Sequence, residues 1–210
     1  MKGRELVVGV TGGIAAYKTA GLVSRLVQAG ARVSVVMTES AAELVGPKTF
    51  EALTGRPVRI GMFADAQHPH PHIELADQAE LLCVAPATAN LLAKAAWGLA
   101  DDLLSTLLLS FYRPIILAPA MNSRMWEKPS VQRNIAQLRS DGFILIDPEE
   151  GYLSCGHTGP GRMAEPETIF RVIAETLDKG TSRSSGPNPK VQQDGTSNSK
   201  SQGPSVQRPS

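Results

Sequence analysis

The stretch ELVVGVTGGIAAYKTAGLVSRLVQAG, residues 5–30, predicts how this chain begins to fold. Its first six residues are mostly apolar, which is typical of a strand covered on both faces of a parallel sheet. A turn containing Gly12 and Gly13 follows, and then a helical pattern that ends at Gly30. We expect one helical face to be shared by Ile14, Tyr17, Leu22, Leu26 and Val27. The stretch therefore predicts a first strand–turn–helix unit.

The same alternation continues along the chain. Four further apolar runs predict strands at residues 32–38, 80–87, 113–120 and 142–148. Helical patterns lie between them, with breaks expected at Pro47 and Gly98, and an amphipathic helix closes the series from Glu165. Strands interleaved with helices predict an α/β domain, a three-layer doubly wound parallel sheet with right-handed crossovers.

Bulk properties exclude several classes of partner. The chain has 210 residues with 21 basic and 20 acidic side chains, and a formal charge of +1 gives no reason to expect nucleic acid or an anionic membrane. No apolar run approaches membrane-spanning length. The first residues lack a signal-peptide cleavage site and continue directly into the first strand. Two cysteines, Cys83 and Cys155, cannot form a disulfide framework and fit a reducing cytoplasm.

The composition changes at residue 179. From there to residue 210, Ser, Gly, Pro, Gln and Asn dominate, and Val191 and Val206 are the only aliphatic side chains. Such a segment cannot bury enough apolar surface to offset the entropy of ordering it. We therefore expect one domain over residues 1–178 and a disordered tail over 179–210.

Ligands of doubly wound sheets lie at the carboxyl ends of the strands, so the segments after each strand are the candidates for function. The turn TGGIAAYK, residues 11–18, offers glycines that let backbone amides approach a ligand and a helix N-terminus that favours an anion. It matches neither the dinucleotide nor the Walker A pattern. We expect a phosphate site there; a plain tight turn is the alternative.

Polar side chains also follow the second, third and fourth strands. Thr38, Thr88 and Asn122 each precede a helical segment and could be no more than N-caps. Capping by Thr88 leaves Asn90 unexplained, and Asn122 is unusual among Met121, Met125 and Trp126. Both amides are therefore candidate ligand contacts.

The segment before the third strand contains His68, His70 and His72 at alternate positions. Pro69 and Pro71 hold this backbone extended, and no Cys or carboxylate lies at ligand spacing nearby, so we expect no metal site. His72 leads directly into an amphipathic segment. It is the histidine that we expect to be held rigidly, for a structural or a catalytic purpose.

The segment after the fifth strand, residues 149–166, is too long and glycine-rich for a plain connector. Loops of this kind are often lids or binding loops. Cys155 lies near its middle, and a free thiol in such a loop favours a functional role.

Together these segments resemble the flavin-dependent cysteine decarboxylases, and among them the phosphopantothenoylcysteine decarboxylases of coenzyme A biosynthesis. The PAMN-x-x-MW stretch and the Cys-Gly-x-x-Gly-x-G-x-M loop are specific, whereas the glycine turn alone is not. The matching stretches are GGIAAYK (12–18), Thr38, HIEL (72–75), PATANLLAK (86–94), GLADDLL (98–104), APAMNSRMW (118–126) and CGHTGPGRMAEP (155–166).

The resemblance implies a flavodoxin-like (Rossmann-like) fold and a cytoplasmic homotrimer, or a multiple of trimers, that binds FMN at its subunit interfaces. The implied cofactor-binding residues are Gly12, Gly13, Ile14, Thr38, Thr88, Ala89, Asn90 and Ala120. The implied substrate-binding residues are Asn122, Met125, Gly156, Arg162 and Met163.

The implied reaction converts 4′-phosphopantothenoylcysteine to 4′-phosphopantetheine. The flavin oxidises the cysteine side chain to a thioaldehyde, which is an electron sink for the departing carboxylate, and then reduces the resulting enethiolate. His72 would act as base or electrostatic partner at the thiol, Asn122 would bind the carboxylate, and Cys155 would supply the late proton. The chain would thus be a carboxy-lyase.

Three other functions share this pattern in part: peptidyl-cysteine decarboxylase of lantibiotic maturation, prenylated-flavin synthase, and a non-catalytic flavoprotein regulator. The Cys155 loop favours the coenzyme A branch, and the presence of both His72 and Cys155 favours an enzyme. In many bacteria such a domain is fused to a synthetase. Here the chain continues into the tail, so we expect the synthetase to be a separate protein.

Overall fold

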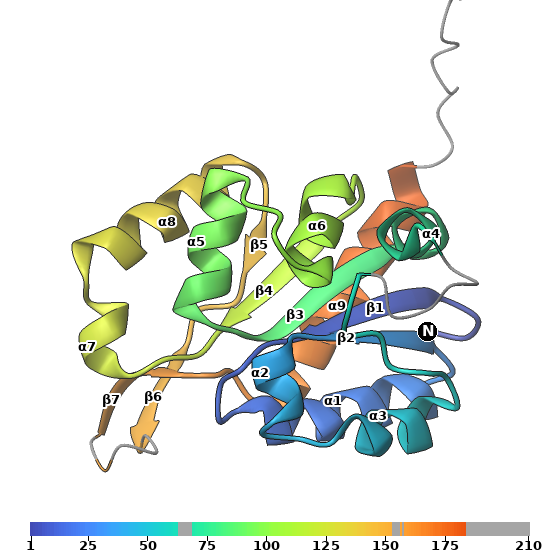
Figure 1. Ribbon diagram of the computed structural model, residues 1–210, viewed down its shortest axis with the longest axis horizontal. Helices are drawn as coiled ribbons and strands as arrows, with labels where there is room; N and C mark the ends of the chain where they lie inside the picture. The colour runs from blue at the N-terminus through green and yellow to red at the C-terminus, as the bar shows by residue number, and fades with distance from the viewer. Residues whose placement is uncertain (63–68, 153–155, 157, 184–210) are drawn as a thin grey trace, which may run out of the picture.

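The computed structural model describes residues 1–62, 69–152, 156 and 158–183 (Figure 1). At its centre is a five-stranded parallel sheet in the order β2-β1-β3-β4-β5. The strands are β1 (Glu5–Val10), β2 (Arg32–Met37), β3 (Leu81–Ala87), β4 (Ile115–Pro119) and β5 (Ile144–Leu145). All five coincide with the predicted apolar runs. β1, β3 and β4 are almost wholly buried, as expected for strands covered on both faces.

Helices cover both faces of the sheet and make three layers (Figure 1). On one face a core forms with α1 (Ala16–Gln28), α3 (Pro47–Thr54) and α9 (Pro166–Arg183). On the other face a second core forms with α4 (Pro71–Gln78), α5 (Ala89–Trp97), α6 (Leu103–Ser110) and α8 (Pro129–Ser140). Two four-residue helices, α2 (Glu39–Ala42) and α7 (Ser123–Trp126), follow β2 and β4. The predicted doubly wound α/β fold is confirmed.

The breaks between helices follow local chemistry. Gly98 ends α5 in the left-handed conformation with φ of 67°, which separates α5 from α6 as predicted. Pro47 opens α3, where its missing N–H costs nothing. The predicted breaks at both residues are confirmed.

The predicted apolar face of α1 is wrong at its start. The helix begins only at Ala16, so Ile14 precedes it, and Ile14 and Tyr17 are 59% and 62% exposed. The buried positions of the helix are Ala16, Thr19, Leu22, Val23 and Leu26. Periodicity alone cannot distinguish a core side chain from one that borders a crevice at the end of the sheet.

The glycine-rich segment after β5 forms an antiparallel hairpin of β6 (Glu149–Tyr152) and β7 (Thr158–Arg162). Residues 153–155 and 157 of this segment lie outside the described residues. The last helix, α9, runs to Arg183 and so crosses the boundary expected at residue 178. The rest of the expected tail, residues 184–210, lies outside the described residues. Among the described helices, none has the length and apolarity needed to cross a membrane.

Candidate active site

The strand order reverses between β1 and β3, and the crevice at such a switch point is the usual ligand site of doubly wound sheets. Buried threonines tie the loops at this point together. The Thr11 hydroxyl donates to the Pro86 carbonyl oxygen at 2.7 Å and accepts from the Thr88 N–H at 3.1 Å. The Thr19 hydroxyl donates to the Ala85 carbonyl oxygen at 2.6 Å. These bonds fix the exit of β1 against the exit of β3.

Two adjoining crevices open at this end of the sheet. The first crevice, of about 860 Å³, lies between the start of α1, the β4–α7 junction and the base of the hairpin. The second crevice, of about 700 Å³, lies between the β2–α2 junction and the starts of α5 and α6. Both volumes fall in the range of small-molecule sites. The crevices share the residues Gly12, Thr88, Ala89 and Met125.

All eight residues expected to bind the cofactor line these crevices. Gly13, Ile14 and Ala120 line the first crevice only, and Thr38 and Asn90 line the second only. The other three are among the residues that the crevices share. The eight come from four separate loops, so the fold gathers residues that are up to 108 positions apart between Gly12 and Ala120.

The glycine turn differs in detail from the expectation. A Cβ on Gly12 would overlap Ser40 of α2, so packing between the two loops requires a glycine there. The Gly13 N–H donates to the Thr11 carbonyl oxygen at 2.8 Å and is not free. The next two amides, of Ile14 and Ala15, form no hydrogen bond with the described part of the chain. These two N–H groups at the start of α1 can receive an anion.

Three expected site residues do cap helices. Thr38 accepts from the Ala41 N–H at 3.2 Å and Thr88 from the Leu91 N–H at 3.5 Å. The Oδ1 of Asn122 accepts from the Met125 N–H at 2.9 Å. The capping interpretation is therefore correct for all three. It is not complete, because each of them also lines a crevice, and capping leaves the NH₂ group of Asn122 to donate elsewhere.

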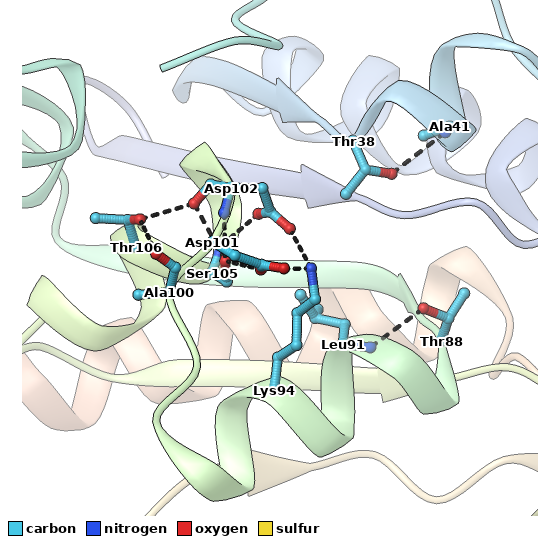
Figure 2. Close-up of polar contacts among 10 residues, drawn as sticks. All are labelled: Thr38, Ala41, Thr88, Leu91, Lys94, Ala100, Asp101, Asp102, Ser105 and Thr106. Atoms are coloured by element: carbon cyan, nitrogen blue, oxygen red, sulfur yellow. Dashed lines mark hydrogen bonds and ion pairs between the residues drawn. The ribbon is translucent and has the colours of Figure 1, made fainter.

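A charged cluster forms one wall of the second crevice. Lys94 of α5 reaches Asp101 and Asp102 (Figure 2). The distances from its Nζ to the carboxylate oxygens are 2.6 and 2.7 Å. Asp102 also begins α6 with a capping box, since its carboxylate accepts from the Ser105 N–H at 2.8 Å and its own N–H donates to the Ser105 hydroxyl at 3.1 Å. The cluster thus joins α5 to α6 across the turn at Gly98.

This pairing shifts the ionisation of both partners. Burial opposes the charged form of Lys94, but hydrogen bonds to Asp101 and Asp102 outweigh it and raise the pKa of Lys94. Burial likewise opposes the Asp102 carboxylate, while hydrogen bonds from Lys94 and Ser105 hold the pKa of Asp102 below its ordinary value. The cluster is therefore fully charged at neutral pH.

A second charged cluster borders the first crevice. Lys18 of α1 donates to Glu165 Oε1 at 2.9 Å, and Arg162 of β7 pairs with the same oxygen. The hydrogen bond from Lys18 is the main cause that lowers the pKa of Glu165, and Arg162 contributes to it. The Glu165 N–H also donates to Glu149 Oε1 at 3.2 Å.

The base of the hairpin is fixed against the β4–α7 junction. The Met121 N–H donates to the Gly161 carbonyl oxygen at 2.9 Å, and a Cβ on Gly161 would overlap the Met121 carbonyl group. A Cβ on Gly159 would meet the Ser123 hydroxyl in the same way. The segment that we expected to be a lid or binding loop is a hairpin whose base lies against the Asn122 segment.

The expected substrate-binding residues divide into two groups. Asn122, Met125, Arg162 and Met163 line the first crevice, although Met163 is only 1% exposed and packs mainly in the core. Gly156 is exposed, with φ of 86°, and does not line either crevice. Within the single chain Met125 is 42% exposed.

The three expected catalytic residues are not brought together within the described chain. Asn122 lines the first crevice, whereas His72 lies in the first turn of α4 and borders neither crevice. The Nδ1 atom of His72 is buried and has no hydrogen-bond partner among the described residues. Cys155 lies outside the described residues, as does His68. Within the described residues, no group of three potential metal ligands comes together.

The sequence did not predict a place in the site for several residues that line the first crevice, namely Tyr17, Lys18, Tyr152 and Glu165. Lys18 and Glu165 are 147 positions apart, so their pairing has no local signal. The only sequence signal was that both lie inside stretches that carry the family resemblance. A third hollow of about 670 Å³, between α5, α6 and the start of β4, contains none of the expected site residues.

Comparison with known families and curated proteins agrees with this geometry. The family model described as Flavoprotein matches residues 1–178. The coenzyme A biosynthesis bifunctional protein CoaBC of Bacillus subtilis is 48% identical over 184 residues, which are 87% of this chain and 45% of that protein. The corresponding protein of Haemophilus influenzae is 44% identical over 176 residues, which are 83% of this chain and 44% of that protein. The chain thus spans less than half the length of these relatives.

Solved structures give the same result for the fold. The FMN-dependent cysteine decarboxylase SpaF superposes with a TM-score of 0.75 at 35% identity, covering 85% of this chain and 97% of that one. A mutant PPC decarboxylase in complex with pantothenoylaminoethenethiol superposes with a TM-score of 0.76 at 29% identity, covering 84% of this chain and 100% of that one.

Proposed function

This chain belongs to the Flavoprotein family, and from that premise we propose that it uses FMN to decarboxylate 4′-phosphopantothenoylcysteine to 4′-phosphopantetheine. Family membership indicates a flavin, and the choice of FMN and of this substrate is the proposal. The observation that carries it is the first crevice, at the switch point of the sheet, which Asn122 lines together with Ala120, Gly13 and Thr88. The 48% identity to a bifunctional protein of coenzyme A biosynthesis supports the choice of substrate.

The residues that line the two adjoining crevices together fit FMN. They offer small side chains, neutral polar groups on Thr38 and Asn90, and the two free amides of Ile14 and Ala15 for the phosphate. When bound, FMN supplies a two-electron acceptor for the sulfur-bearing carbon of the cysteine and returns the electrons after carbon dioxide has left. The protein supplies binding and orientation.

Asn122 is placed to bind the carboxylate that leaves. Its Oδ1 is held by the Met125 N–H at 2.9 Å, and this bond orients the amide so that its NH₂ group is the remaining donor. A neutral donor binds a carboxylate without the strong charge pairing that would hold the carboxylate in place. Asn122 therefore orients the substrate and allows the charge to move during the reaction.

His72 is proposed to act in the crevice of a neighbouring copy within a homotrimer. In its own chain it borders neither crevice, and its buried Nδ1 has no partner among the described residues. Exposed apolar side chains of the first crevice, Ile14 and Tyr17, are suited to contact a second copy. Mixed trimers test this, because a His72→Asn chain combined with an Asn122→Ala chain should regain part of the activity that each lacks alone.

Cys155 is proposed as the donor of the late proton, on the strength of the resemblance alone. We place the reaction in the cytoplasm, where both thiols would stay reduced.

The direct test is decarboxylation by the purified protein. The protein should show the visible absorption of bound flavin, and incubation with 4′-phosphopantothenoylcysteine should give a product lighter by one carbon dioxide, detected by mass spectrometry. His72→Asn should abolish turnover while flavin absorption remains. Absence of product with flavin-loaded wild-type protein would contradict the proposal.

A decarboxylase of another cysteine compound, such as a peptide ending in cysteine, is the second candidate, because the cysteine decarboxylase SpaF shows a higher identity, 35%, than the PPC decarboxylase structure at 29%. A peptide ending in cysteine, supplied in the same assay, distinguishes the two. Carbon dioxide release from the peptide and not from the phosphopantothenoyl compound would favour this second function.

A further inference from the structure

The proposed chemistry does not say which chemical group the charged cluster of the first crevice would bind. Lys18, Arg162 and Glu165 all line this crevice, and the two cations share a single oxygen of Glu165. The Lys18 side chain is only 14% exposed. Its ammonium group is thus held at a largely buried site rather than in open solvent.

The charges at this wall do not balance on the crevice side. Two cations face one lining carboxylate, and the other nearby acid, Glu149, does not line the crevice and accepts from the Glu165 N–H. An incoming group with two negative charges would therefore find a partly unmatched pair of donors. Arg162 and Lys18 are also the two side-chain types that bind phosphate oxygens best.

The position of Lys18 in α1 is unfavourable for helix stability. It is the third residue of the helix, and no acidic residue lies in the first turn. A cation near a helix N-terminus is repelled by the helix dipole. An anion bound beside Lys18 would relieve this repulsion.

We propose that Lys18 and Arg162 bind the phosphomonoester of the substrate, and so distinguish a phosphopantothenoyl substrate from a peptide. This inference rests on the proposed function. The flavin's own phosphate is the other possible source of this group. The cluster borders only the first crevice, together with Asn122, whereas the expected flavin residues extend across the shared edge to Thr38 and Asn90 in the second. This placement favours the substrate.

The test compares two substrates with Lys18→Gln protein. Its kcat/KM for 4′-phosphopantothenoylcysteine should fall roughly 10- to 100-fold, the loss expected for one charge-assisted contact. Its kcat/KM for unphosphorylated pantothenoylcysteine should stay within about twofold of wild type. Arg25→Gln is the matched control: Arg25 also lies in α1 and pairs with a glutamate, Glu167, but does not line the crevice, so both substrates should be unaffected.

Glu165→Gln separates recognition from a structural role of the cluster. Removing the shared carboxylate should leave both cations free and keep or lower the KM for the phosphorylated substrate. An equal fall for both substrates in Lys18→Gln, or no fall at all, would overturn the inference. Loss of bound flavin in Lys18→Gln would also overturn it, by assigning the site to the flavin phosphate. If wild type releases no carbon dioxide from either substrate, the proposed function itself fails.

Discussion

Replacement of Asp102 tests how the wall of the second crevice is held. Asp102→Ala removes the N-cap of α6, which contributes about 1 kcal/mol in comparable helices. It also removes one of the two carboxylates paired with Lys94, a pair whose side chains are 16% and 33% exposed. Solvent screening limits that ion pair to less than about 1 kcal/mol.

The sum predicts that Asp102→Ala lowers the free energy of unfolding by about 1–2 kcal/mol. For a domain of this size such a loss corresponds to a fall in Tm of roughly 2–8 °C. Asp102→Asn is the matched control, because asparagine caps helices as well as aspartate does but carries no charge. It should lose less than about 1 kcal/mol. Urea unfolding followed by circular dichroism measures both values.

The contribution of Asp102 to the free energy of unfolding should depend on pH in a definite direction. The pKa of Asp102 is lower in the folded chain than its ordinary value, so its carboxylate stabilises the fold above the unfolded pKa of about 3.9. That stability is lost as the pH falls through the lowered folded pKa. The difference in free energy of unfolding between wild type and Asp102→Asn should therefore be largest at neutral pH and should disappear below about pH 4. Two results would refute this: an equal loss of unfolding free energy in Asp102→Asn and Asp102→Ala, or a difference between wild type and Asp102→Asn that persists in acid.

Three further changes probe other parts of the site. Gly161→Ala should destabilise the protein by more than about 2 kcal/mol in urea unfolding, because the φ of Gly161 is 126° and the new methyl group would overlap Met121. Gly21→Ala is the control, because Gly21 lies in α1 with open space around it, and this change should be neutral or stabilising. Asn122→Ser keeps a capping oxygen but lacks the amide donor, so its rate of carbon dioxide release should fall at least about 100-fold while its free energy of unfolding stays close to that of wild type. Asn122→Ala should lose the same activity and also about 1 kcal/mol of stability. Equal activity of Asn122→Ser and wild type would exclude a role for the amide. Arg113→Met removes the guanidinium that donates to the carbonyl oxygens of Ala76, Asp77 and Ala79 at the end of α4. Because His72 lies in the same helix, its displacement should lower turnover while the amount of bound flavin stays constant, and a parallel loss of flavin would contradict this.

The parts of the fold that were predictable are those governed by local pattern. Buried parallel strands require continuous apolar runs, and all five runs became strands. Gly98 and Pro47 end and begin helices because of their own backbone chemistry.

The positions of side chains near the site were less predictable. Ile14 and Tyr17 fit a helical apolar face by spacing, yet they border the first crevice, where an apolar side chain can serve a ligand or a partner. The partnership of Lys18 with Glu165 joins the two ends of the domain, so only the tertiary fold reveals it. The glycine turn was recognised, but the need for Gly12 comes from Ser40, which belongs to a different loop.

The central claim is that carbon dioxide release depends on flavin held between the exits of β1 and β3. The most direct measurement prepares the protein with graded flavin content and follows release from 4′-phosphopantothenoylcysteine in each sample. The account predicts a rate proportional to bound FMN and a rate of zero in flavin-free protein, restored when FMN is added back. Release at an undiminished rate from flavin-free protein would contradict it.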